Sequence, residues 1–124
     1  GDAGNAVAAG SNDIKYNYIG TDKNAETDLG NTSDGIRLEL GTGNTITGNV
    51  VGNHSGIDDS GNGNVGIEVL DDDNAITGNL VGTNANGDNL ENRQAIVIEG
   101  ASNNTVGGTG IGEGNVMAFS TYTG

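Results

Sequence analysis

A nine-residue segment recurs along the chain at intervals of about 30 residues. Residues 44–52 (NTITGNVVG) are followed 30 positions later by residues 74–82 (NAITGNLVG), which differ only at positions 45/75 and 50/80. A weaker copy occupies residues 12–20, and residues 104–108 begin a fourth. Recurrence of this kind predicts four turns of one repeating unit, each of which buries its apolar side chains against the next.

A second recurring block precedes each copy and has the pattern of a β-strand. Residues 35–40, 66–70 and 95–99 alternate apolar with mostly polar side chains, and residues 4–8 are a degenerate version. Such alternation is typical of a strand with one buried face. Short turns at 41–43, 71–73 and 100–103 follow these blocks, and long polar loops at 21–34, 53–65 and 83–94 connect the units.

Each unit is therefore predicted to form a strand, a tight turn, a second strand, a short third strand and a long loop. No segment spaces its apolar residues as a helix does, and glycine interrupts every stretch. Parallel stacking of equivalent strands predicts one all-β domain over residues 1–124, a parallel β-helix (β-solenoid) of about four coils. The alignment predicts four inner columns: Ile36, Ile67 and Ile96; Leu38, Val69 and Ile98; Ile14, Ile46, Ile76 and Val106; Ile19, Val51 and Val81.

Composition fits a narrow stacked core and excludes several partners. The chain has 24 Gly, 19 Asn and only 32% hydrophobic residues, which is enough when each column needs one aliphatic side chain per turn. The net charge of -13 disfavours nucleic acid and acidic membranes, because few cations are present to neutralise phosphates. The absence of Cys excludes disulfides, thiolate metal sites and cysteine nucleophiles.

Asparagine recurs at one position of the nine-residue segment, at Asn17, Asn49 and Asn79. Asn side chains spaced one strand apart can pass amide hydrogen bonds along a stack and satisfy backbone groups at turns. We interpret these three residues as a structural ladder and the aligned Gly20, Gly52 and Gly82 as corners.

Several of these strings resemble the repeats of bacterial right-handed parallel β-helix proteins of the pectate-lyase-like superfamily. The strings are residues 17–22 (NYIGTD), 79–84 (NLVGTN), and 103–108 (NNTVGG) with 114–116 (GNV). The resemblance implies a right-handed coil and a secreted or cell-surface location. Residues 1–10 lack a signal-peptide pattern, so an export signal is expected to have been removed or to lie outside this sequence.

Known members of that superfamily have more coils and a capping helix. This comparison implies that the chain is an excised or truncated array with an open strand ladder at each end. Open ladders expose unpaired backbone groups, so we expect a homo-oligomer joined through the coil ends.

Enzymes of the superfamily carry acidic and basic side chains on an exposed strand face. Arg37, Glu39, Glu68 and Glu99 occupy such positions here and are the candidate catalytic residues. Glu39 and Glu99 would lie about 9.6 Å apart along the stack, near the range of inverting hydrolases. We interpret Arg37 and Glu68 as a surface ion pair. We interpret Glu39 and Glu99 as solvated surface groups.

Two acidic segments are candidate calcium sites. The turn of Asp71, Asp72 and Asp73 concentrates three carboxylates, and Asp58, Ser60 and Asn62 resemble the first half of an EF-hand loop. The loop lacks the Glu that would complete the motif, so solvated or structural acidic turns remain the alternative, and no cofactor is required. His54 stands alone in a loop and is expected to be solvated.

These features favour a non-catalytic structural or adhesive module whose long loops form a recognition surface for a carbohydrate or protein ligand. Aromatic residues are confined to the two ends of the stack, which argues against an extended glycan groove. Thr45 and Thr47 suggest an ice-binding row, but the other copies break it. The main alternative is a remnant of a polysaccharide-active lyase, hydrolase or epimerase.

Overall fold

The computed structural model describes the backbone of residues 5–7, 10–54 and 64–121, and side chains from residue 10 onward within these ranges. This part of the chain contains no helix, and therefore none that could span a membrane. Its strands are β1 (Asn5–Val7), β2 (Asp13–Lys15), β3 (Tyr18–Ile19), β4 (Ile36–Leu38), β5 (Thr45–Thr47), β6 (Val50–Val51), β7 (Val65–Val69), β8 (Ala75–Thr77), β9 (Leu80–Val81), β10 (Gln94–Ile98), β11 (Thr105–Val106) and β12 (Val116–Met117).

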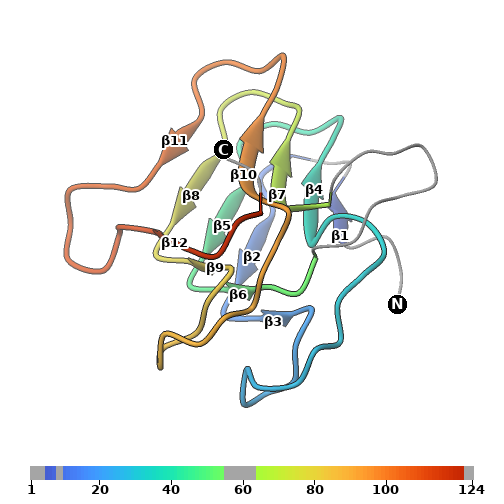
Figure 1. Ribbon diagram of the computed structural model, residues 1–124. Helices are drawn as coiled ribbons and strands as arrows, with labels where there is room; N and C mark the ends of the chain where they lie inside the picture. The colour runs from blue at the N-terminus through green and yellow to red at the C-terminus, as the bar shows by residue number, and fades with distance from the viewer. Residues whose placement is uncertain (1–4, 8–9, 55–63, 122–124) are drawn as a thin grey trace.

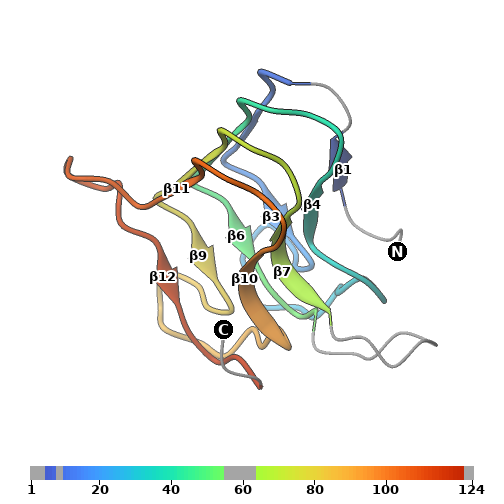
Figure 2. The same ribbon diagram turned by 90° about the horizontal axis from the view of Figure 1, so that it is seen from above.

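The strands form three four-stranded sheets whose pairings are all parallel (Figures 1 and 2). The first sheet has the order β1-β4-β7-β10, the second β11-β8-β5-β2 and the third β12-β9-β6-β3. The chain thus visits the three sheets in the same sequence four times. We call these four visits the first (β1–β3), second (β4–β6), third (β7–β9) and fourth (β10–β12) pass.

The four predicted apolar columns are present in the predicted register. Side chains from all three sheets meet in one core cluster, in which Ile36, Ile46, Ile67 and Ile76 have no exposed surface. In the fourth pass most inward positions are uncovered: Ile98, Val106 and Met117 are 39%, 42% and 51% exposed, whereas Ile96 packs against the core. The strand pattern therefore determines which side chains point inward. These side chains become completely buried where a neighbouring pass lies on each side of them.

The turn between the second and third sheets carries a column of asparagines. The backbone N–H groups of Asn17, Asn49 and Asn79 donate to the side-chain oxygen of the next asparagine at 2.9 Å each, and the column ends at Asn115. Each of these side-chain NH₂ groups also donates to the next side-chain oxygen, at 2.9–3.0 Å. Asn49 and Asn79 are fully buried, so these bonds satisfy polar groups that water cannot reach.

A second asparagine column, which the sequence interpretation missed, lies where the second sheet begins. Backbone N–H groups of Asn12, Asn44 and Asn74 donate to the side-chain oxygens of Asn44, Asn74 and Asn104 at 2.8–3.1 Å. The signal was available, because these residues open each copy of the nine-residue segment.

His54 belongs to a third column, so the expectation that it is solvated is wrong. Its backbone N–H donates to Asn92 Oδ1 at 3.1 Å, and its ring Nδ1 accepts the N–H of Asn31 at 3.2 Å. The side chain has no exposed surface. Nδ1 therefore performs the acceptor role that an Asn oxygen performs in the other columns, which requires the neutral ring with its proton on Nε2.

Two of the predicted corner glycines have the left-handed backbone conformation, Gly20 with φ 80° and Gly82 with φ 82°. A Cβ atom at Gly20 would collide with the carbonyl oxygen of Gly52, and one at Gly82 with that of Ala118. These corners need glycine both for the backbone angle and for the close approach of the next pass.

Because His54 acts as an acceptor, we expect acid to destabilise the protein below about pH 6.5. Burial lowers the pKa of His54 in the folded state, with the carboxylates of Asp34 and Asp28 opposing the shift. The unfolded chain then binds the proton more readily, so this contribution to stability is complete above the unfolded pKa and declines as the pH falls below it. The slope should not exceed about 1.4 kcal/mol per pH unit.

Chemical denaturation of the wild type and His54→Asn between about pH 7.5 and 5.5 checks this expectation. Asn supplies the same acceptor without titrating, and the chain has one His, so the difference between the two curves isolates residue 54. The difference should be flat at neutral pH and fall toward acid. Parallel curves over the whole range would contradict the assigned role.

Candidate functional site

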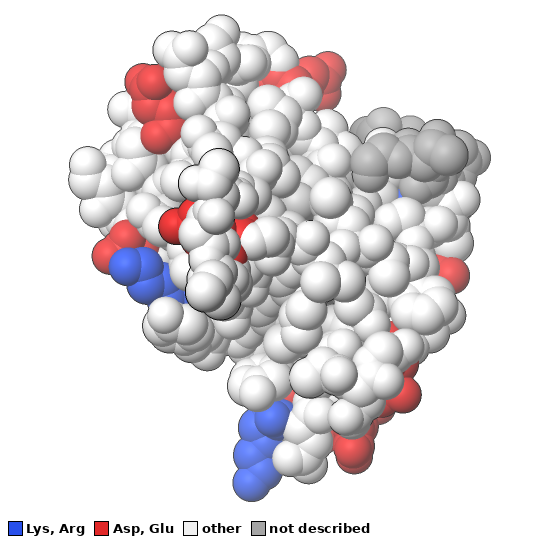
Figure 3. Space-filling view, turned by 90° about the vertical axis from the view of Figure 1, so that its left-hand side faces the viewer, with Lys and Arg blue, Asp and Glu red and all other residues white. Residues whose placement is uncertain are grey.

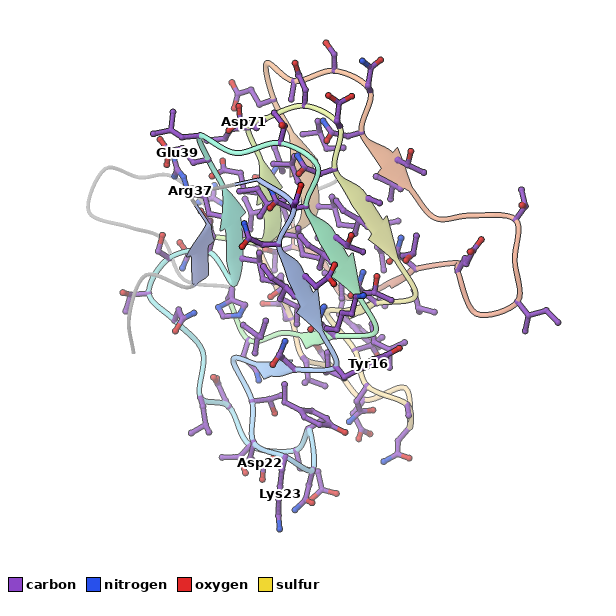
Figure 4. All side chains as sticks on the ribbon, turned by 180° about the vertical axis from the view of Figure 1, so that it is seen from behind. Tyr16, Asp22, Lys23, Arg37, Glu39 and Asp71 are labelled. Carbon is purple, nitrogen blue, oxygen red and sulfur yellow. The ribbon has the colours of Figure 1, made fainter. Side chains whose placement is uncertain are left out.

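The outward face of the first sheet gathers an arginine and several carboxylates. Arg37 on β4 lies directly opposite Glu68 on β7, and its guanidinium Nη1 is 3.1 Å from Glu68 Oε2. Arg37 Nε donates to Glu39 at 3.1 Å, and Nη1 lies 3.8 Å from Asp34. The structure therefore brings together three of the four candidate catalytic residues. Figure 4 shows Arg37 and Glu39 side by side at the end of the sheet near Asp71.

Asp34 is a member of this cluster that sequence reasoning missed. It is 6% exposed, and its Oδ1 accepts the backbone N–H of Val65 at 2.9 Å, which ties the second pass to the third. A single Asp in a long polar loop carries little sequence signal. Its position directly before the glycine that opens a strand block was the available indication.

The environment of Glu68 raises the pKa of its carboxyl group. Burial is the main cause, the negative charge of Asp34 adds to it, Arg37 opposes it, and Glu99 contributes a smaller repulsion. A carboxyl group with a raised pKa is one feature of the general acids that enzymes use. In this structure Glu68 also pairs with Arg37, and Asp34 also accepts the backbone N–H of Val65.

The acidic turn of Asp71, Asp72 and Asp73 makes contacts between passes. Asp71 Oδ2 accepts the backbone N–H of Gly41 at 2.7 Å, and Asp72 Oδ1 accepts that of Ser102 at 2.6 Å. Across the described residues, no three His, Asp or Glu side chains are grouped so that they could hold a metal ion. Calcium binding here stays a prediction, and Asp58, Ser60 and Asn62 lie outside the described residues.

A pocket of about 190 Å³ lies on the outward face of the third sheet. Its lining residues come from β3, β6 and β9 and from two loops: Tyr18, Asn24, Ala25, Val50, Leu80, Asn84, Ala85 and Asn86. The loop residues fall in the predicted recognition loops 21–34 and 83–94. The strand residues were missed, although each two-residue strand of this sheet pairs an inward with an outward apolar position, as in Tyr18 and Ile19.

Each of the two loops is organised by one polar side chain. Asp22 Oδ1 accepts the N–H groups of Glu26 and Thr27 at 2.9 and 3.3 Å, and these bonds lower the pKa of Asp22. Asn84, at the aligned position, accepts the N–H groups of Asn86 and Asp88 at 2.9 and 3.0 Å. The loops thus have a common design in which an Asx oxygen binds the following backbone.

Comparison with family models, with curated proteins and with solved structures found no match for this chain.

Proposed function

We propose that the chain is a right-handed parallel β-helix of about four coils that serves as a non-catalytic structural or adhesive module, outside the cell or on its surface. Three parallel sheets visited in a fixed order support the coiled architecture. The right hand and the location rest on the resemblance of the repeats, and the long loops are the proposed recognition surface.

The proposal of a non-catalytic role rests on the contacts that the charged side chains of the first sheet and of the turns make between passes. Asp34, Asp71 and Asp72 each accept a backbone N–H from another pass. Arg37 pairs with Glu68 across two strands. Groups engaged in this way fasten one pass to the next, whereas an acid, base or substrate clamp has to be available to a substrate.

We further propose that copies of the chain associate through the open face of the fourth pass. Strands β10, β11 and β12 each end their sheet, so each presents an edge that no other strand of the described residues pairs with. The apolar side chains at this end are Ile98, Val106, Val116, Met117 and Phe119, which are 39–51% exposed. A second copy would cover these side chains and pair with the open edges.

Sedimentation equilibrium tests this association. We expect a dimer or larger species that dissociates on substitution of Val106→Lys with Met117→Lys, because charges would be buried at the joint. Leu29→Lys, at a loop residue that is 58% exposed, is the matched control and should leave the mass unchanged. Addition of EDTA should not alter the wild-type mass. A wild type that stays monomeric at all concentrations would contradict the association.

A remnant of a polysaccharide-active enzyme is the second candidate, favoured by one observation. Glu68 has a raised pKa and lies near Asp34, and glycoside hydrolysis uses two carboxyl groups. An exposed aromatic platform is missing from this face, because the described aromatic residues Tyr16, Tyr18 and Phe119 lie on or beside the other two sheets.

A turnover assay on acidic and neutral polysaccharides separates the two functions. The proposed function predicts no product above the buffer blank for the wild type, Glu68→Gln and Glu99→Ala alike, because no substrate is transformed. Turnover by the wild type that falls at least about 100-fold in Glu68→Gln would overturn the non-catalytic function and identify Glu68 as an acid or base.

A further inference from the structure

The pocket on the third sheet lies over a floor made by strands of three successive passes. Val50 on β6 and Leu80 on β9 are directly paired and point outward, and Tyr18 on β3 is paired with Val50 in the same outward row. Loop residues Asn24 and Ala25 line one side, and Asn84, Ala85 and Asn86 line the other. An apolar strip is therefore enclosed by two loops.

The two loops are joined to each other although they are 59 residues apart in sequence. Asn84 Nδ2 donates to the carbonyl oxygen of Ala25 at 2.8 Å and to Asp88 Oδ2 at 2.8 Å. Asn84 Oδ1 already accepts two backbone N–H groups, so its side chain is fully used in fixing the loops. Asn84 and Ala25 are 6% and 4% exposed, so this hydrogen bond between the loops is buried. The pocket is consequently formed before any ligand arrives.

The lining combines an apolar surface with neutral hydrogen-bonding groups. Tyr18 is 51% exposed and lines the pocket beside the aliphatic floor. The side chains of Asn24 and Asn86 are exposed, and each offers an NH₂ donor and a carbonyl acceptor. No charged side chain lines the pocket, in a chain whose net charge is -13. Figure 3 shows the left-hand side of the molecule as drawn in Figure 1, where acidic groups form separate clusters, with two basic groups, around broad uncharged surface.

We propose that this pocket binds one ring of a neutral sugar. A pyranose presents an apolar C–H face, which would pack on Tyr18 and Leu80, and hydroxyl groups, which would pair with the amides of Asn24 and Asn86. The volume suits a single ring and not an extended chain. The net negative charge of the chain and the lack of a lining cation disfavour a uronate or a phosphate. The inference deepens the proposed function, on which it rests, by naming the ligand class of the adhesive loops.

Titration of isotope-labelled protein with glucose, galactose, mannose and N-acetylglucosamine, followed by NMR, tests the proposal. We expect at least one sugar to shift the amide signals of Ala25, Leu80 and Asn86, with a Kd of about 1 mM, as is reasonable for so small a ligand. Galacturonate should bind at least about tenfold more weakly, because its carboxylate meets the negative field of the chain.

Single-residue variants test whether the sugar binds in this pocket. Tyr18→Ala and Asn86→Ala should each weaken binding at least about fivefold, through lost ring contact and lost hydrogen bonds respectively. Tyr16→Ala is the matched control, since Tyr16 is another exposed tyrosine of the first pass that lies outside the pocket, over Gly48. It should bind as the wild type does. Unchanged amide spectra away from each substitution show that the variants are folded.

Three results would overturn the inference. They are the absence of shifts with every neutral sugar, shifts that persist unchanged in Tyr18→Ala, and shifts of the pocket signals by a short leucine-containing peptide but by no sugar. The last result would assign the pocket to a protein ligand. If a sugar binds and is chemically altered during the titration, the pocket stands and the non-catalytic function fails, so the two failures are distinguishable.

Discussion

The hydrogen bond from a backbone N–H to an asparagine side-chain oxygen of the next pass is the interaction on which this structure depends. A chain that turns sharply between sheets leaves backbone groups at each corner without partners, and a buried unpaired group costs about 1–3 kcal/mol. Asn is short enough to reach the adjacent turn, and it carries both an acceptor and donors. In the columns of Asn49 and Asn44, the backbone N–H at the corner of one pass donates to the asparagine side-chain oxygen of the next pass.

This constraint also explains why few large apolar residues suffice. The interior needs only one or two aliphatic side chains per sheet and pass, such as Ile46 and Val51, and these are completely buried. Polar columns at the corners then set the register that keeps those side chains stacked. The charged groups of the first sheet also join neighbouring passes: Arg37 pairs with Glu68, and Asp34 accepts the backbone N–H of Val65. The proposed function assigns recognition to the loops, where the pass-to-pass pattern no longer determines each side chain.

The sequence predicted most of what the repeats encode, except the second asparagine column, and missed features that lie outside the repeats. The apolar columns and the Asn17 column follow from alignment, because equivalent positions in parallel passes must be neighbours. His54 was misplaced because its column replaces Asn with a different residue at a position where the loop length also changes. The pocket was beyond sequence reasoning, since it depends on the Asn84–Ala25 contact between two distant loops. Asp34 was missed for a similar reason, as only the fold reveals which strand N–H it accepts.

Hydrogen exchange of the asparagine amides tests the central role of these columns most directly. The N–H groups of Asn44, Asn49, Asn74 and Asn79 lie in turns between strands, where amides ordinarily exchange quickly, yet each donates to a neighbouring side-chain oxygen. The account predicts that they exchange within about tenfold of the strand amides of β5 and β8. Exchange at the rate of an unprotected peptide, while those strand amides stay protected, would contradict it.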